Sequence, residues 1–220
     1  MVEAVLFDLD GTLADTAADL GDALNGLRAE ADLPPLPASS IRPHVSQGVR
    51  GLLRIGFAIA PGHADYPAMH QRFLARYESA LCNSTTLFAG VAELLDALDA
   101  MDLRWGIVTN KTSRYTLPIV AALGLGRRCA CIVSGDSAPR PKPAPDPLLL
   151  ASGLVDTPPG QCVYVGDDLR DIEAGTAAGM ETVAAAWGYL GDGKPIAEWG
   201  AGTIIESPAG LLPVLGARAC

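Results

Sequence analysis

Two aspartates separated by one leucine, Asp8-Leu9-Asp10, directly follow a short apolar run near the start of the chain. Residues two apart in an extended strand point to the same face, so both carboxylates would point the same way. Two carboxylates that close repel each other, and a site that keeps them usually supplies a cation or a shared proton. Gly11 permits the sharp turn that must follow. The pair predicts a metal or acid–base site, and acids at an exposed strand end are the alternative.

A second acidic cluster, Gly166-Asp167-Asp168-Leu169-Arg170-Asp171, follows another apolar run. In open α/β sheets, ligands bind at the carboxyl ends of parallel strands. Asp167 could therefore join Asp8 and Asp10 in a ligand set made of oxygen atoms, which suits Mg²⁺ rather than Zn²⁺. The alternative is capping of a helix N-terminus, for which Asp168 is well placed. We expect both interpretations to hold, for different residues of the cluster.

Two further features fit a phosphate ligand. Thr109 ends an apolar run, and the backbone N–H groups after it, from Asn110 onward, lead into an expected helix N-terminus, which is an anion site. Lys142 lies between prolines and would offer a point charge on a stiff loop to a phosphoryl oxygen. Taken alone, Lys142 would be interpreted as a surface lysine, because most lysines are exposed. We interpret Lys111 as a structural or supporting residue.

These residues require a scaffold in which strands and helices alternate. Apolar runs predict strands over 3–8, 104–109, 130–134, 162–166 and 181–185. Helical spacing and Gly or Pro punctuation predict helices over 91–101, 117–123, 147–152 and 168–178. The economical fold is a doubly wound parallel sheet of the α/β class.

The segment between the first acid pair and residue 86 has a different pattern. Leu20, Leu24 and Leu27 lie on one face of an expected helix, and residues 41–82 keep a helix-like spacing without a strand-like run. We therefore predict an all-helical insertion over 15–85 within an α/β core made of 1–14 and 86–220.

Composition argues against several classes of function. The 220 residues carry a formal net charge of −9, which is unfavourable for a nucleic-acid-binding protein. The apolar runs are shorter than the roughly 18 residues of a membrane span, and the acidic N-terminus does not resemble a signal peptide. Five cysteines in such a chain are expected to be reduced, so we expect a cytoplasmic protein. All three histidines lie in the first third of the chain, which leaves carboxylates as the acid–base groups elsewhere.

In this order, the acid pair, the strand-end threonine, the proline-flanked lysine and the Gly-Asp-Asp sequence resemble the haloacid dehalogenase superfamily of phosphatases. The likeness spans essentially the whole chain. The matching motifs are Asp8 to Thr12, Thr109, Lys142, and Gly166 to Asp171. Within the superfamily the chain is similar to the phosphoglycolate phosphatase group, and especially to bacterial N-acetylmuramic acid 6-phosphate phosphatases, in residues 108–111, 166–172 and 187–189.

The resemblance implies a Mg²⁺-dependent phosphatase that forms an aspartyl-phosphate. It implies that Asp8 is the nucleophile, and that Asp10 protonates the leaving alcohol and later takes a proton from water. It places Mg²⁺ between Asp8, the Asp10 main-chain carbonyl and Asp167, with Asp171 in support. It also implies that the helical insertion is a cap over the site.

By the same resemblance, Thr109, Asn110 and Lys142 hold the phosphoryl oxygens of a small phosphate monoester. Both candidate substrates, 2-phosphoglycolate and N-acetylmuramic acid 6-phosphate, also carry a carboxylate. Because the core is acidic, we expect a cap cation, Arg50, to bind it. An exposed helix arginine is the alternative.

Other activities remain open on the sequence. A dehalogenase would not need the second acid, so Asp10 argues against one. A sugar-phosphate mutase would keep every motif, and so would a catalytically inactive phosphate-binding protein. The expected state of the protein is a monomer or a homodimer.

Overall fold

The protein is described by a computed structural model over residues 2–191 and 193–216. The expected core, 1–14 and 86–220, therefore includes a few residues outside the described ones, among them Cys220. Within the described chain, six parallel strands form one sheet in the order β5-β4-β1-β6-β7-β8. The strands are β1 (Ala4–Phe7), β4 (Arg104–Val108), β5 (Cys131–Val133), β6 (Cys162–Gly166), β7 (Glu181–Ala185) and β8 (Thr203–Ile205). The predicted doubly wound α/β fold is confirmed.

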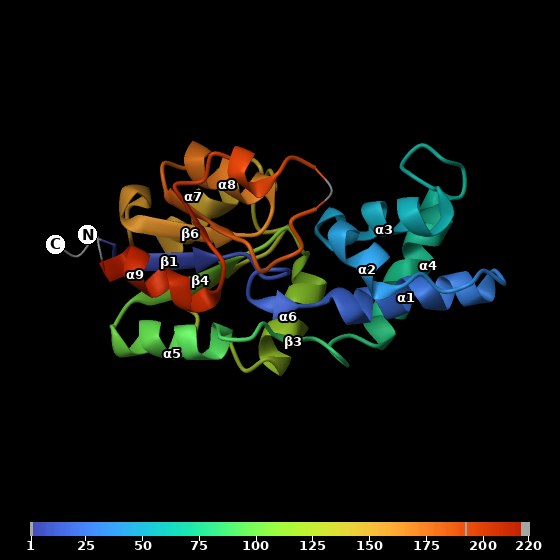
Figure 1. Cartoon of the computed structure of the whole chain (residues 1–220), viewed down its shortest axis with the longest axis horizontal. Helices are drawn as coiled ribbons and strands as arrows, with labels where there is room; N and C mark the ends of the chain where they lie inside the picture. Colours follow the sequence, from blue (N-terminus) through green and yellow to red (C-terminus); the bar gives the residue numbers. More distant parts are fainter. Residues whose placement is uncertain (1, 192, 217–220) are drawn as a thin grey trace.

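Helices cover both faces of this sheet, which explains why its strands are continuously apolar. The helices are α5 (Val91–Ala100), α6 (Ser113–Ala122), α7 (Asp146–Leu154), α8 (Leu169–Ala177) and α9 (Leu211–Gly216). Val5, Phe7 and Val165 pack with residues of α5, α6 and α9 on one face. Leu6 and Tyr164 pack with residues of α7 and α8 on the other. Figure 1 shows α7 and α8 above the sheet and α5 below it.

A separate group of helices lies beyond one end of the sheet (Figure 1). It consists of α1 (Ala17–Glu30), α2 (Ala38–Ile41), the 3₁₀ helix η1 (Arg42–Gln47), α3 (Gly48–Phe57) and α4 (Tyr66–Ser79). Leu24, Leu52, Leu53 and Phe73 are fully buried at its centre. We call residues 16–85 the helical segment. Its role as a cap stays a prediction.

The chain passes between the sheet and the helical segment through two short strands that pair with each other. β2 (Ala14–Asp15) and β3 (Thr86–Leu87) are antiparallel, with Asp15 opposite Thr86. The buried Asp19 carboxylate then accepts hydrogen bonds from Ser84 N, Thr85 N and Thr85 Oγ1 at 2.8, 3.1 and 2.6 Å. Entry and exit of the helical segment are thus held together.

Element boundaries agree with expectation to different degrees. The predicted strands 162–166 and 181–185 coincide with β6 and β7, whereas the helix expected over 117–123 begins earlier, at Ser113. The first residues of α6, Ser113 and Arg114, are polar, so the apolar spacing does not reveal them, and Pro118 lies inside the helix. The pair β2–β3, β8 and α9 were not anticipated either, because they are short. Among the described residues, no helix is both long and apolar enough to cross a membrane.

Candidate active site

The residues singled out in the sequence follow neighbouring strands, and the parallel sheet brings them to one edge. Phe7 in β1 pairs with Ile107 in β4 and with Val165 in β6, so the residues that follow these three strands emerge side by side. Asp8 N donates to Val165 O at 2.9 Å, and Thr109 N donates to Val133 O in β5 at the same distance. The sheet order therefore gathers motifs that are far apart in the sequence.

Three buried carboxylates meet at this edge. Oxygens of Asp8, Asp167 and Asp171 lie within 4.8 Å of one another, and all three residues are buried. Burial, opposed by Lys142, raises the pKa of Asp8 to about 7, and the neighbouring acids add to the increase. Burial and the charges of Asp8 and Asp171 raise the pKa of Asp167 well above its usual value. Such a set of oxygen donors is suited to a divalent cation, which would relieve this repulsion.

Lys142 is the cation already present in this cluster. Its ammonium group lies 2.7 Å from Asp171 Oδ1 and 3.0 Å from Asp8 Oδ1, and its side chain is 3% exposed. Nζ also donates to Tyr164 Oη at 2.7 Å and to Val108 O at 3.0 Å. Burial opposes the charge, but Asp171 and Asp8 raise the pKa of Lys142. The side chain is thus a fixed positive charge against Asp8 rather than a surface lysine.

Asp10 has different partners. Its Oδ1 accepts hydrogen bonds from Lys111 Nζ at 2.8 Å and from Thr16 Oγ1 at 2.6 Å. Lys111 is 10% exposed at its side chain, and Tyr77 of α4 places its ring centroid 5.1 Å from Nζ. The two acids of the first motif are therefore held by separate lysines. Lys111 belongs to the site, and the sequence signal for it was its position two residues beyond the strand-end threonine.

Asp167 is held by the first motif and by the chain after β7. Thr12 Oγ1 donates to Asp167 Oδ1 at 2.9 Å, and Tyr189 N donates to Asp167 Oδ2 at 2.8 Å. Gly11 has φ +90°, and a Cβ there would lie 2.1 Å from Asp167 Oδ2. Glycine at this position is therefore required both by the backbone conformation and by the close approach of the carboxylate.

Asp168 has the helix-capping role that was expected for one residue of this cluster. Its Oδ1 accepts from Arg170 N at 2.9 Å, and Asp168 N donates to Asp171 Oδ2 at 3.1 Å, which completes a capping box at the start of α8. Although burial opposes it, the Arg170 guanidinium lowers the pKa of Asp168. The same guanidinium donates to Ser46 O in the helical segment.

The residues expected to hold phosphate lie beside the acids. The Thr109 hydroxyl accepts from Lys111 N at 3.2 Å. The Asn110 side chain bonds to the main chain of Lys142 at both of its ends, with Oδ1 accepting from Lys142 N and Nδ2 donating to Lys142 O, each at 2.9 Å. The Asn110 amide thus fixes the loop that carries Lys142.

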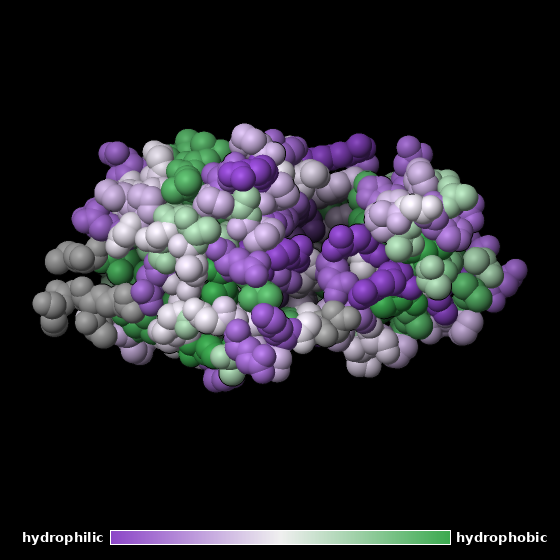
Figure 2. Space-filling model, turned by 90° about the horizontal axis from the view of Figure 1, so that it is seen from above, coloured by the Kyte–Doolittle hydropathy of each residue, from purple (hydrophilic) through white to green (hydrophobic). Residues whose placement is uncertain are grey.

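A cavity of about 400 Å³ lies between the sheet edge and the helical segment. From the sheet side it is lined by Asp8, Asp10, Thr109, Asn110, Lys111, Lys142, Asp168, Arg170 and Asp171. From the helical segment it is lined by residues that include Ser46, Gln47, Arg50, Tyr66, His70 and Tyr77. Arg50 therefore faces the same cavity as Asp8. Figure 2 shows the surface hollowed between the two parts, with hydrophilic side chains around the hollow.

Comparisons with known proteins found similar sequences and a similar fold. The family model described as haloacid dehalogenase-like hydrolase matches residues 5–185. A phosphoglycolate phosphatase of Xanthomonas campestris pv. campestris is 44% identical over 94% of each chain. An N-acetylmuramic acid 6-phosphate phosphatase of Pseudomonas aeruginosa is 38% identical over 100% of this chain and 97% of its own. The crystal structure of a predicted phosphoglycolate phosphatase from Haemophilus somnus superimposes with a TM-score of 0.85 at 28% identity, and covers 97% of this chain and 98% of its own.

Proposed function

The chain belongs to the haloacid dehalogenase-like hydrolase family, and from this premise we propose that it is a Mg²⁺-dependent phosphatase of a small phosphate monoester that carries a carboxylate. The observation that carries the proposal is the position of Asp8 in the cavity, 3.0 Å from Lys142 Nζ and within the same oxygen cluster as Asp167. A carboxylate that attacks a dianionic ester needs its repulsion offset, and Lys142 supplies a fixed positive charge.

Asp8 and Asp10 divide the covalent and the proton-transfer chemistry. A carboxylate oxygen of Asp8 bonds to phosphorus while the bond from phosphorus to the alcohol oxygen breaks, and Asp10 gives the departing oxygen its proton. Water then attacks phosphorus, Asp10 takes a proton from that water, and the bond between Asp8 and phosphorus breaks to release phosphate. Lys111 and Thr16 both bond to Oδ1 of Asp10, so we assign the proton transfer to Oδ2.

The phosphoryl group is held from the side of β4. Thr109 contributes its hydroxyl, and Lys142 contributes the ammonium that already contacts Asp8. Because both ends of the Asn110 side chain bond to Lys142, we assign its contact with phosphate to the main-chain N–H at the entry to α6.

The buried oxygen cluster fits Mg²⁺. Asp8, Asp167 and the main-chain carbonyl of Asp10 would hold the ion, and Asp171 would support it while bonded to Lys142. When bound, the ion would neutralise charge that develops on the phosphoryl oxygens.

The helical segment acts as a cap that recognises the alcohol half of the substrate, and Arg50 binds its carboxylate. Volume favours the larger of the two substrates that the relatives' names suggest. A cavity of about 400 Å³ is within the range that holds drug-sized molecules. It therefore accommodates N-acetylmuramic acid 6-phosphate, whereas 2-phosphoglycolate would leave most of the volume to water.

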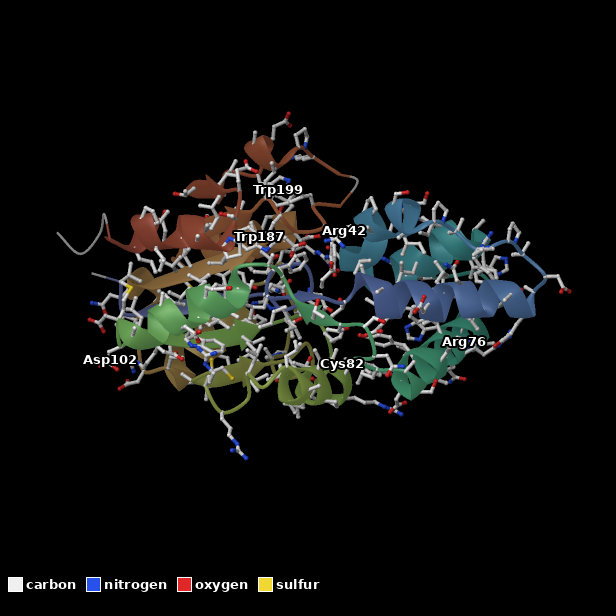
Figure 3. All side chains as sticks on the ribbon, turned by 60° about the horizontal axis from the view of Figure 1, so that its bottom comes forward. Arg42, Arg76, Cys82, Asp102, Trp187 and Trp199 are labelled. Atoms are coloured by element: carbon white, nitrogen blue, oxygen red, sulfur yellow. The ribbon has the colours of Figure 1, made fainter. Side chains whose placement is uncertain are left out.

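The test is a panel of phosphate monoesters assayed with the purified protein and Mg²⁺, including both candidate substrates and p-nitrophenyl phosphate. Asp8→Asn should abolish turnover because the amide is not a nucleophile, while the fold is kept. The matched control is Asp102→Asn, the same change at an exposed residue with φ +58°, which asparagine tolerates. Figure 3 shows Asp102 at the end of the molecule away from the helical segment. Appreciable turnover by Asp8→Asn would refute the covalent mechanism, and a requirement for a sugar bisphosphate would identify a mutase instead.

A further inference from the structure

Tyr189 belongs to the sequence Trp187-Gly188-Tyr189 after β7, and the chemistry proposed above leaves its side chain without a role. The residue is 4% exposed and lies beside two parts of the site. Its main-chain N–H donates to Asp167 Oδ2 at 2.8 Å. Its side chain extends the other way, toward the strand β2 that leads into the helical segment.

The Tyr189 hydroxyl contacts Thr16, one of the two residues that bond to the Asp10 carboxylate. It accepts a hydrogen bond from Thr16 N at 2.8 Å and donates to Asp15 Oδ1 at 3.0 Å. The side chain of Thr16 in turn donates from Oγ1 to Asp10 Oδ1 at 2.6 Å. The Tyr189 hydroxyl therefore holds the main chain of Thr16, and the Thr16 side chain holds the carboxylate assigned to proton transfer.

The aromatic ring of Tyr189 contacts both the helical segment and the chain that leaves it. The Arg42 guanidinium of η1 lies 4.9 Å from the ring centroid and also bonds to Asp15 at 2.8 Å. The ring of Phe88, directly after β3, is 6.1 Å from that of Tyr189. Figure 3 shows Arg42 at the junction between the helical segment and the sheet. Tyr189 is thus held where the chain crosses between the two parts.

The backbone that carries Tyr189 has little freedom to shift. A Cβ on Gly188 would lie 2.2 Å from Asp167 Cβ and 2.5 Å from Gly11 O, so the chain here is packed directly on the first motif. Trp187 Nε1 donates to Thr12 O at 3.0 Å. A side chain mounted on such a backbone can hold its hydrogen-bond partners in place.

We propose that the Tyr189 hydroxyl is a positioning group for proton transfer by Asp10, and that it acts through Thr16. The proposal rests on the proposed phosphatase function and deepens it. The hydroxyl and the main-chain N–H of Tyr189 have separate tasks, since the first orders the proton donor and the second orders Asp167. Loss of the hydroxyl should impair protonation of the leaving group and leave the metal requirement unchanged.

The experiment compares two esters with Tyr189→Phe, which deletes one oxygen. An alkyl phosphate, chosen as the best substrate of the panel, needs a proton on its leaving oxygen, whereas p-nitrophenolate departs without one. We expect kcat/KM for the alkyl phosphate to fall about tenfold or more, within the contribution of general acid catalysis. For p-nitrophenyl phosphate the fall should be less than about threefold, and the Mg²⁺ concentration for half-maximal activity should not change. The ratio of the two rates is independent of the fraction of folded protein.

Two further variants separate positioning from a general structural effect. Thr16→Val should reproduce the selective loss, and the double variant should lose no more than Thr16→Val alone, because both changes break one path. Trp187→Phe removes a hydrogen bond from the same loop, and any loss it causes should be equal for both esters. Any one of three results with Tyr189→Phe would overturn the proposal. These are equal losses of kcat/KM on both esters, no loss on the alkyl ester, and a change in the Mg²⁺ concentration for half-maximal activity. Failure of the wild-type protein to hydrolyse either ester would instead refute the phosphatase function.

Discussion

Lys142→Met removes the cation of the carboxylate cluster while keeping a long side chain of similar volume. The ammonium group lies 2.7 Å from Asp171 and 3.0 Å from Asp8, and these two carboxylate side chains are 1% and 13% exposed. Without Lys142, both acids would remain buried next to Asp167, with no other ammonium group of the described residues bonded to them. The perturbation therefore tests whether the cluster is as desolvated as its geometry indicates.

Removing one partner of a buried ion pair destabilises a protein by about 3–5 kcal/mol. For a chain of this length, each kcal/mol shifts Tm by roughly 2–4 °C, so the expected fall is about 6–20 °C. The loss should be larger near pH 8 than near pH 5, because carboxylates that lack a cation can take up a proton more readily at the lower pH. Mg²⁺ should raise the Tm of the variant more than that of the wild type, since it replaces the missing positive charge.

The assay is denaturant and thermal unfolding of metal-free protein, repeated with Mg²⁺. Lys194→Met, the same substitution at an exposed lysine, is the matched control, and its unfolding free energy should stay within about 0.5 kcal/mol of wild type. A loss below about 1 kcal/mol for Lys142→Met, or one equal to that of Lys194→Met, would refute the view that Lys142 neutralises a desolvated cluster.

The remaining predictions concern the metal and the cap. Asp167→Ala should weaken Mg²⁺-dependent activity far more than Asp168→Ala does. Asp168→Ala should instead lower the free energy of unfolding by about 1 kcal/mol, because the helix cap is lost. Equal activity losses in the two variants would show that the wrong acid is assigned to the ion. Arg50→Ala should raise KM for the carboxylate-bearing substrate by about tenfold or more, which corresponds to the ~1.5–3 kcal/mol of a charged hydrogen bond. Turnover of p-nitrophenyl phosphate should barely change. Parallel losses on both substrates would indicate a structural role for Arg50. Because the pKa of Asp8 is raised from 3.8 to about 7, its contribution to stability is lost as pH rises through that range, so the Tm of metal-free protein should fall from acidic to neutral pH. Mg²⁺ binds the deprotonated carboxylates, so it should raise Tm more near pH 8 than near pH 5, and an equal rise at both would contradict the proposed ligands.

Much of the fold and the identity of the acids could be predicted from local pattern. Strands β6 and β7 end where the apolar runs end, because a strand covered on both faces must be apolar throughout. Asp8 and Asp167 could be expected together, since the carboxyl ends of parallel strands meet at one edge. The helix-capping role of Asp168 could also be expected from its position at a helix start.

The partners of these acids were decided by the tertiary structure. Lys142 contacts Asp8 and Asp171, Lys111 contacts Asp10, and the Asn110 side chain serves the Lys142 loop. Tyr189 reaches Thr16 across 173 positions of the sequence. Such contacts depend on the order of strands in the sheet and on the place where the chain crosses into the helical segment. The sequence alone therefore indicated which groups we propose for the chemistry, because residue type and local spacing are written in it. Which lysine or tyrosine holds each group depended on long-range packing, which no local pattern records.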